Sequence, residues 1–320
     1  MGAHTHSHGH GHSHGTGHDH SHGRSHGHGH GHTHDGIDWT LQLANLRRDD
    51  AMGEESSALI ARRLIGLVTT ELPTIVDIGA GAGGQSAALA RELAGRGGGR
   101  LVIVDAVPEL IEAARATVDN ALAGDDRVRV ETVHADAADD ALADLVPRAD
   151  VVWASRMVHH LPDQQAGTDR LARLLHPEGW LALSEGGLGT RCLPWDLGIG
   201  APGLQDRLLA ARDAGFGRMR AEIPAAVRMP YGWGTALERA GLHTVTSFSV
   251  LTEHPAPPSK EVRDSVVAWL EALRTHIGAD IAAADRETID ALLDSTAPTF
   301  IATREDIFML GASTIYLGQR

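Results

Sequence analysis

The chain has 320 residues, of which 42% are hydrophobic, and a formal net charge of −14 with histidine counted as neutral. An acidic chain without basic runs interleaved with aromatic residues is a poor partner for nucleic acid, so a small-molecule substrate is expected. Cys192 is the sole cysteine, which excludes an intramolecular disulfide and a thiolate cluster. No apolar run approaches the roughly 18–20 residues that cross a bilayer, and the N-terminus lacks the apolar region of a secretion signal. We therefore expect no membrane partner and a cytoplasmic location.

Histidine and glycine dominate the first 34 residues, which hold 14 of the 21 histidines. This segment has almost no apolar surface to bury, so residues 1–35 are predicted to be a disordered tail. Imidazole is a common ligand of transition metals, which predicts that the tail binds divalent Ni, Zn, Cu or Co, as a store, sensor or delivery arm, or else is inert. The candidate ligands are His4, His6, His8, His10, His12, His14, His18, His20, His22, His26, His28, His30, His32 and His34.

Residues 36–320 are predicted to form one large domain that begins with two helices within residues 36–72. From Thr74 onward, short apolar runs alternate with helical segments. Strands that are apolar throughout and separated by helices are typical of a parallel sheet covered on both faces. The predicted strands are "TIVDIG", "RLVIVDA", "VRVETVHAD", "ADVVWAS" and "GWLALSEGG", and the main helices between them are "QSAALARELA", "PELIEAARATVDNA" and "QQAGTDRLARLLH".

The last third of the chain follows a different pattern. Residues 187–230 contain "LGTRCLPWDLGIGAPG", which is rich in glycine and proline and predicts a loop, followed by a helix. Residues 231–320 contain further helices and two segments with strand character, near 242–253 and 307–317. We expect these two segments to form an antiparallel pair that closes the sheet.

Glycines crowd the turn after the first predicted strand, and their spacing alone leaves the ligand open. Gly79, Gly81 and Gly84 satisfy G-x-G-x-x-G, the dinucleotide fingerprint, whereas Gly79, Gly81 and Gly83 satisfy D-x-G-x-G-x-G read from Asp77. A carboxylate at Asp77 is able to attract a cationic ligand group or to orient the turn through backbone N–H groups. A pyrophosphate would be repelled by it.

Two further aspartates end the next two predicted strands. Asp105 ends the second strand, where a carboxylate can hold both hydroxyls of a ribose in a dinucleotide or in another nucleoside. Asp136, within "HAD", ends the third strand and can accept hydrogen bonds from an exocyclic amine such as that of adenine.

Five stretches, in order, resemble the class I S-adenosylmethionine-dependent methyltransferases. They are "VDIGAGAGG", "IVDAVPELIEAAR", "VHADAAD", "ADVVWASRMVHHLPD" and "LARLLHPEGWLALSE". The resemblance implies a Rossmann-like, doubly wound, seven-stranded and mostly parallel α/β sheet with an antiparallel C-terminal strand pair. Residues 73–186 would be the core that binds S-adenosylmethionine. "HPEGW" stands where the family often has a Pro-Gly-Gly turn, which alters one turn.

The resemblance also implies a role for each residue of the cofactor site. The glycine turn approaches the methionine part of the cofactor, Asp105 holds the ribose, and Ala106 or Val107 lines the adenine. Asp136 and Ala137 contact the adenine edge. The full set of implied cofactor-binding residues is Asp77, Gly79, Ala80, Gly81, Gly83, Asp105, Ala106, Asp136, Ala137 and Ser155.

Methyl transfer needs alignment of the nucleophile, exclusion of water and sometimes removal of a proton. Arg156, His159 and His160 follow the fourth predicted strand and are expected at the edge of the sheet where ligands bind. Either histidine is a candidate general base because imidazole titrates near neutral pH; alternatively, one packs inside and the other caps the next helix. Arg156 would hold a substrate carboxylate or pair with a nearby acidic residue.

Residues 187–230 are expected to lie over this site. Candidates for the substrate pocket, each also compatible with a packing role, are Trp195, Arg218, Arg220, Tyr231 and Trp233, with Trp39, Arg47 and Arg48 on the opposite side. The predicted function is methyl transfer from S-adenosylmethionine to an unidentified small molecule. Two alternatives stay open: a metal-handling protein whose fold only senses the cofactor, and a nicotinamide-dependent oxidoreductase.

Overall fold

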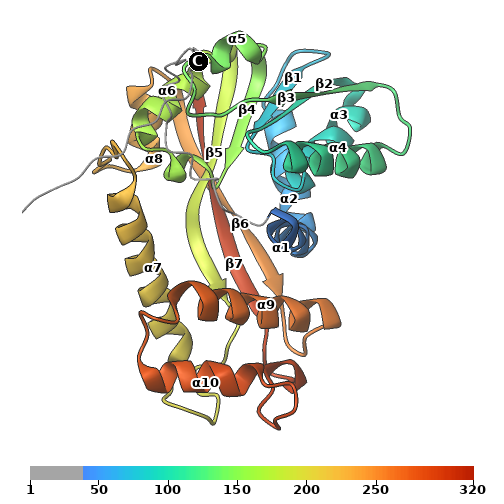
Figure 1. Ribbon diagram of the computed structural model, residues 1–320. Helices are drawn as coiled ribbons and strands as arrows, with labels where there is room; N and C mark the ends of the chain where they lie inside the picture. The colour runs from blue at the N-terminus through green and yellow to red at the C-terminus, as the bar shows by residue number, and fades with distance from the viewer. Residues whose placement is uncertain (1–38) are drawn as a thin grey trace, which may run out of the picture. The chain divides into compact units, whose positions relative to one another are not determined.

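The computed structural model of the chain describes residues 39–320, with side chains from residue 42 onward (Figure 1). The predicted tail and its candidate metal ligands lie outside these residues. Within the described part of the chain, no three His, Cys, Asp or Glu side chains are grouped so that they could hold a metal ion. None of the helices found between residues 39 and 320 combines the length and the apolar character needed to cross a membrane.

Seven strands of the described chain form one mixed sheet in the order β3-β2-β1-β4-β5-β7-β6. The first five strands of this order pair in parallel, and β7 pairs antiparallel with both β5 and β6. This arrangement confirms the predicted doubly wound sheet and its antiparallel C-terminal pair. The strands are β1 (Thr74–Ile78), β2 (Gly99–Asp105), β3 (Val128–His134), β4 (Ala149–Ser155), β5 (Leu175–Arg191), β6 (His243–His254) and β7 (Met309–Gln319).

Helices alternate with these strands along the chain. They are α1 (Trp39–Met52), α2 (Glu54–Gly66), α3 (Gly84–Arg96), α4 (Pro108–Leu122), α5 (Leu142–Leu145), α6 (Gln164–Arg173), α7 (Leu204–Glu222), α8 (Trp233–Arg239), α9 (Lys260–Ile277) and α10 (Ala283–Leu293), with short 3₁₀ turns η1 (Val158–His160) and η2 (Ile301–Thr303). The Ser259 hydroxyl caps α9 and the Asp163 carboxylate caps α6, each by accepting a hydrogen bond from a backbone N–H of the first turn.

Both faces of the parallel sheet are buried. Ile75 and Leu101 face a cluster that includes α2, α3 and α4, whereas Val76 and Val102 face a cluster that includes α5, α6 and α8. Because neighbouring residues of a strand point to opposite faces, both sets must be apolar. This is the physical reason why the strands appear in the sequence as nearly continuous apolar runs.

The winding of the sheet reverses between β1 and β4, which are neighbours. From β1 the chain proceeds outward to β2 and β3, and from β4 it proceeds to β5 on the other side. In open parallel sheets this reversal leaves a crevice at the carboxyl ends of the strands, where ligands bind. The glycine turn follows β1, and η1 with its two histidines follows β4, so the topology brings both to this crevice.

The structure differs from the sequence-based prediction after Gly187. Residues 188–191 were expected to belong to a loop, but they continue β5 as far as Arg191, and Leu188 pairs with Ala312 of β7. The stretch is too rich in glycine to show a strand pattern by itself. It is held extended by pairing with the last strand of the chain, a contact that local sequence does not reveal.

A third apolar cluster lies beyond the end of β5, apart from the two clusters that cover the parallel sheet. It joins α7, α9 and α10 through buried residues such as Leu208, Val266 and Ile289. As predicted, two helices stand between β6 and β7 in the chain, and Figure 1 shows α9 and α10 beside the far ends of these strands. The extended strands therefore link the parallel core to a second helical layer.

Candidate active site

The turn between β1 and α3 has a backbone that favours glycine. Gly79, Gly81 and Gly83 have φ angles of 71°, 58° and 88°, in the left-handed region that other residues rarely adopt. A Cβ atom at Gly83 would also lie 2.6 Å from the Cα of Ala114, so this glycine lets α3 pack closely on α4. Gly79 donates its backbone N–H to the carbonyl of Val104 at 2.8 Å, which ties the turn to the end of β2.

Asp77 lies beneath this turn and is 2% exposed. Its carboxylate accepts a hydrogen bond of 2.5 Å from the hydroxyl of Ser86 in the first turn of α3. Burial raises the pKa of Asp77 from 3.8 to about 7; the Ser86 bond opposes this rise, and the nearby carboxylates of Asp105 and Asp50 add to it. Asp77 thus links β1 to α3 through a side chain rather than through the backbone of the turn.

Asp105 ends β2 beside the glycine turn and is 7% exposed. One carboxylate oxygen accepts a hydrogen bond from the backbone N–H of Gly81 at 3.0 Å, and the other accepts from Val107 at 3.1 Å. Ala106, between them, is partly exposed. Asp105 therefore lies where the ribose-binding carboxylate was predicted, and it also holds the turn in place.

Helix α1 contacts the start of α3, which was not predicted. The carboxylate of Asp50 accepts a hydrogen bond from the backbone N–H of Gly84 at 2.9 Å. A Cβ at Gly84 would lie 2.3 Å from the Asp50 carboxyl carbon, so this contact needs glycine. Leu46 lies 3.7 Å from the corresponding Cβ position of Gly81. The first helix of the described chain therefore covers one side of the turn.

Three carboxylates, those of Asp50, Asp77 and Asp105, surround the glycine turn. In dinucleotide-binding folds a pyrophosphate takes the N-terminus of the helix that follows such a turn. Here Asp50 occupies that N-terminus, and the other two acids lie close enough to influence each other's charge. This electrostatic environment disfavours a pyrophosphate and favours a ligand with a positive charge.

The remaining predicted cofactor residues end the neighbouring strands. Asp136 follows β3, is partly exposed and accepts a hydrogen bond from the backbone N–H of Ala138 at 2.8 Å. Ala137 is 6% exposed and packs in the second cluster. Ser155 is the last residue of β4 and pairs in register with Ser184 of β5. All three lie at the carboxyl edge of the sheet.

The two histidines of η1 differ in their surroundings. His159 Nδ1 lies 2.6 Å from a carboxylate oxygen of Glu185, which follows Ser184 at the carboxyl end of the parallel part of β5 and is 1% exposed. The other oxygen of Glu185 accepts a hydrogen bond from the backbone N–H of Val158 at 2.9 Å. The ring of His160 is exposed, and its centroid is 4.2 Å from that of His159. His159 therefore has the buried carboxylate partner that orients a general base.

Arg156 is exposed and has a φ angle of 50°, which is unusual for a residue with a side chain. Its backbone N–H donates to the carbonyl of Ser184 at 3.0 Å. Burial raises the pKa of Asp49 and Asp50 in α1, and the positive charge of Arg156 opposes that rise. Arg156 was predicted either to hold a substrate carboxylate or to pair with a nearby acidic residue. The structure shows that acidic residues lie near it.

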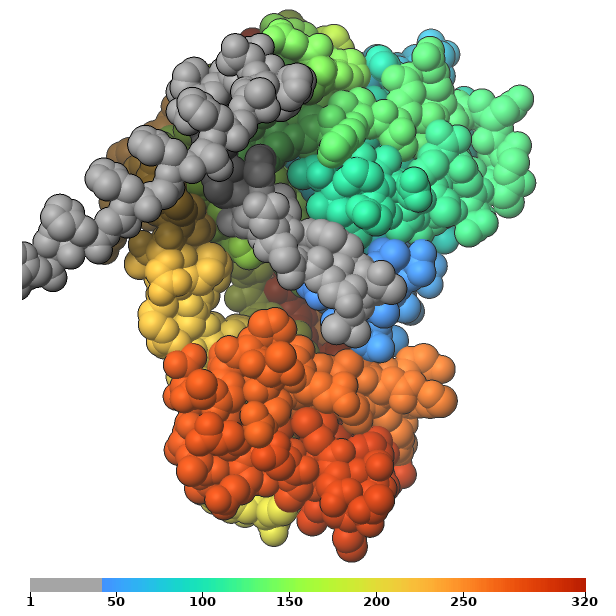
Figure 2. All heavy atoms as spheres, in the orientation of Figure 1, coloured from blue at the N-terminus to red at the C-terminus, as the bar shows by residue number. Residues whose placement is uncertain are grey.

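Arg220 of α7 reaches the histidine-bearing segment. Its guanidinium donates to the carbonyls of Leu161 at 2.5 Å and Pro162 at 3.2 Å. One helical turn earlier, the ring of Phe216 lies edge-on to His159, with centroids 5.5 Å apart. Figure 2 shows a hollow beside α7, in yellow, above the orange helices. Of residues 187–230, α7 thus contacts the segment that bears the two histidines, and Phe216 was not among the predicted pocket residues.

The other substrate-pocket candidates do not gather around His159. Trp195 follows the end of β5, is 71% exposed and lies beside Gly203. Arg218 pairs with Asp280 at 2.6 Å. The Tyr231 hydroxyl donates to the side-chain oxygen of Gln165 of α6.

Four candidates remain: two make local contacts, one is exposed, and the side chain of the last is not described. Trp233 packs against the cluster on the α6 side of the sheet. Arg48 donates to Asn45 one turn earlier in α1, and Arg47 is exposed. The structure describes side chains only from residue 42 onward, so that of Trp39 is not included.

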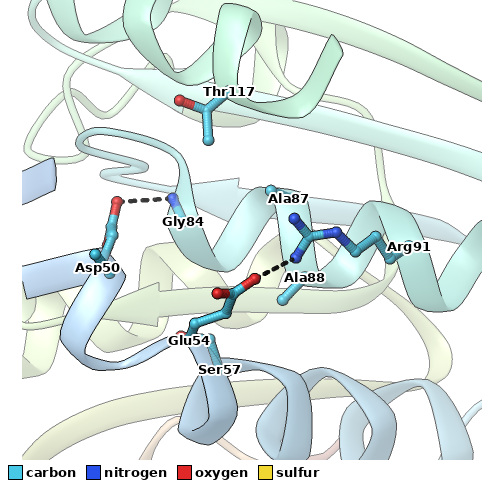
Figure 3. A pocket seen from close by; sticks show the side chains of 9 residues that line it. Asp50, Glu54, Ser57, Gly84, Ala87, Ala88, Arg91 and Thr117 are labelled. Atoms are coloured by element: carbon cyan, nitrogen blue, oxygen red, sulfur yellow. Dashed lines mark hydrogen bonds and ion pairs between the residues drawn. The ribbon is translucent and has the colours of Figure 1, made fainter. Parts of the chain in front are cut away.

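A shallow pocket of about 160 Å³ lies next to the turn, on the outer side of α3 (Figure 3). Asp50 with its Gly84 contact forms one end, Thr117 of α4 lies across from it, and an ion pair between Glu54 and Arg91 crosses the other end at 3.4 Å. The pocket contains neither the histidines nor Asp105. It shares Asp50 and Gly84 with the candidate site and lies outside the part that bears the histidines.

Three residues of the site were missed by sequence reasoning. Glu185 had a signal, because it ends an apolar strand next to the strand that precedes His159. Asp50 stands in "RRDD", where nothing distinguishes it from a surface acid, and Phe216 lies in a helix with no clear apolar face. Both reach the site through tertiary packing alone.

The sheet order, the glycine turn and the acid at the end of β2 are the features that the resemblance to class I S-adenosylmethionine-dependent methyltransferases implies. The comparison with protein families agrees: residues 76–181 match a family described as "Methyltransferase domain". The resemblance predicted from the sequence is therefore confirmed for the core of the chain.

Curated relatives match the same region. Ubiquinone biosynthesis O-methyltransferase of Xylella fastidiosa strain M23 is 34% identical over 111 residues, which are 34% of this chain and 40% of the relative. The protein of that name from strain 9a5c is 33% identical over the same length. The chain thus spans about two fifths of the length of these relatives.

Solved structures with a similar arrangement share little sequence. Haemonchus contortus phosphoethanolamine N-methyltransferase 2 in complex with S-adenosyl-L-methionine is 16% identical, with a TM-score of 0.43 and coverage of 83% of this chain and 52% of that one. The YcgJ protein of Bacillus subtilis is 18% identical, with a TM-score of 0.43 and coverage of 83% and 99%.

Proposed function

We propose that this protein transfers a methyl group from S-adenosylmethionine to a hydroxyl group of a small molecule. The observation that carries the proposal is the contact between His159 and the buried Glu185 at the carboxyl ends of β4 and β5, beside the glycine turn. A base is needed when the acceptor must lose a proton, as a hydroxyl must. The O-methyltransferase name of the Xylella relatives points to the same acceptor atom.

The residues present fit S-adenosylmethionine. Asp50, Asp77 and Asp105 provide a negative environment for a ligand that carries sulfonium and ammonium charges. Asp105 would hold the ribose, and the turn from Gly79 to Gly83 would hold the methionine part. The nucleoside would be lined by residues at the strand ends, namely Ala106, Asp136, Ala137 and Ser155. The bound cofactor would supply an activated methyl group with a good leaving group.

The protein's own contribution is to orient the acceptor and remove its proton. With Nδ1 of His159 engaged by Glu185, Nε2 is the nitrogen that takes the proton from the acceptor hydroxyl as its oxygen bonds to the methyl carbon. The carboxylate of Glu185 stabilises the positive charge that forms on the imidazole. Solvent then receives the proton and restores the neutral base.

The test measures S-adenosylhomocysteine and the mass gain of one methyl group in a metabolite extract. His159→Gln and Glu185→Gln are expected to lower kcat by about 10²–10⁴-fold while the affinity for S-adenosylmethionine, measured by calorimetry, is kept. His176→Gln, at the opposite end of β5, is the matched control. Binding of the cofactor without turnover under any condition would favour the sensing role, and preferential binding of a nicotinamide cofactor would favour the oxidoreductase.

We further propose that the tail of residues 1–34 binds a divalent transition metal separately from this site. Its support is the sequence alone, with 14 histidines in 34 residues. Deletion of these residues is expected to abolish most Ni and Zn binding in calorimetry and to leave cofactor affinity unchanged. A truncated protein that no longer binds S-adenosylmethionine would show that the tail belongs to the enzyme site.

A further inference from the structure

Phe216 places a large apolar ring beside the two imidazoles of η1. Its centroid is 5.5 Å from that of His159 and 6.3 Å from that of His160, with interplanar angles of 67° and 78°. Phe216 is nevertheless 39% exposed. Edge-to-face contacts of this kind are favourable between aromatic rings, so the three rings form one aromatic cluster with an accessible surface.

The position of this ring is fixed by the helix that carries it. Arg220, four residues after Phe216 and thus on the same side of α7, donates to the carbonyls of Leu161 and Pro162 directly after η1. After α7 ends, the backbone N–H of Val227 donates to the same Pro162 carbonyl at 2.9 Å. The segment that follows His159 is therefore held to α7 by Arg220 and to the chain after α7 by Val227, which places the helix that carries Phe216 beside the candidate base.

The aromatic cluster of Phe216, His159 and His160 is chemically suited to bind a flat ring. Phe216 and His160 offer π faces and edges next to His159, and the neighbouring carboxylate of Glu185 is buried and already bonded to His159 and Val158. Aromatic rings gain specific stacking energy on such a surface, whereas saturated rings gain only from burial. An aromatic hydroxyl, with a pKa of about 10 as in tyrosine, also yields its proton to an imidazole more readily than an aliphatic hydroxyl does.

We infer that Phe216 is a specificity-determining residue and that the acceptor is an aromatic hydroxyl compound whose ring lies against Phe216 and His160. This inference rests on the proposed function, because it places the acceptor oxygen next to His159. The reaction forms an oxygen–methyl bond, breaks the sulfur–methyl bond and moves the hydroxyl proton to His159. Nothing beyond the cofactor and the acceptor is consumed.

The experiment uses the full chain and a pair of probes that differ in aromaticity: 2,3-dihydroxynaphthalene and its fully saturated diol. Their binding is measured by calorimetry in the presence of S-adenosylhomocysteine, and their methylation is measured with S-adenosylmethionine. The variants are Phe216→Leu, which keeps an apolar side chain, and Phe300→Leu, a matched change just before η2. Affinity for S-adenosylhomocysteine alone is measured for every variant.

The wild-type protein is expected to bind and methylate the aromatic diol in clear preference to the saturated one. Phe216→Leu should weaken binding of the aromatic diol about three- to tenfold and narrow the preference, while Phe300→Leu should match the wild type. Equal binding of the two diols, or an aromatic preference that survives Phe216→Leu, would overturn the inference while leaving methyl transfer intact. Failure of every variant to bind S-adenosylhomocysteine would instead refute the proposed function.

Discussion

Replacement of Asp77 by Asn should make the ligand-free protein more stable in mildly alkaline solution. Asp77 is 2% exposed, and its pKa is raised from 3.8 to about 7, chiefly by burial. Asparagine has nearly the same shape, carries no charge, and its side-chain oxygen can still accept the hydrogen bond from Ser86. The substitution therefore removes the buried charge and keeps the contact.

The size of the effect follows from proton linkage. Below pH 3.8 Asp77 is protonated in both the folded and the unfolded chain, and its favourable contribution is complete. As the pH rises toward 7 only the folded chain keeps the proton, so the contribution is lost at about 1.36 kcal/mol per pH unit. The loss between pH 5 and pH 8 is thus about 3 kcal/mol, an upper limit because relaxation around the charge reduces it.

Urea denaturation of both proteins at several pH values from 5 to 8 measures this difference. The free energy of unfolding of Asp77→Asn should exceed that of the wild type by an amount that grows with pH and levels off above pH 7. Asp213→Asn, which removes a carboxylate that is 71% exposed, should follow the wild-type curve. A constant or shrinking difference would refute the reasoning, since it would mean that Asp77 carries no buried charge at high pH.

Two further predictions test the packing: one concerns a substitution at Gly83 and its control, and the other the reactivity of Cys192. Gly83→Ala should lower the free energy of unfolding by about 2 kcal/mol or more, because φ is 88° and the added Cβ would meet the Cα of Ala114 at 2.6 Å. Gly95→Ala, near the end of α3 and with no atom within 4 Å of the new Cβ, should instead stabilise by about 0.5–1 kcal/mol. Thermal unfolding of both variants measures whether the two effects have these opposite signs. Burial raises the pKa of the Cys192 thiol, so a thiol reagent should modify it only after denaturation; rapid modification of the native protein would contradict the buried position.

The sequence predicts the parallel core well because one physical constraint acts at each of its positions. Residues such as Ile75 and Val76 must both be apolar when helices cover both faces of the sheet, so the strand is visible without knowledge of its neighbours. The turn is visible because its left-handed backbone demands glycine, as at Gly79. Asp105 follows from its place at the end of the next strand.

The rest depends on contacts between segments that are distant in the chain. Leu188 is in a strand because Ala312 pairs with it, although its own surroundings are rich in glycine. His159 was one of two equivalent histidines until the structure placed Glu185 against its Nδ1 atom. Phe216 lies in a helix whose sequence has no distinct apolar side, so its place beside His159 depends on where α7 packs. Each of these facts is a property of tertiary pairing rather than of local pattern.

The separate apolar cluster beyond β5 has a consequence for how this architecture diversifies. The helices α7, α9 and α10 rest on residues that do not take part in the two clusters around the parallel strands. Substitutions there can tilt or shift α7, and with it Phe216 and the segment after η1 that Arg220 holds, while Asp105 keeps its contacts with Gly81 and Val107. On the proposed function, selection for a new acceptor can therefore proceed in one layer of the protein without renewed selection for methyl-donor binding in the other.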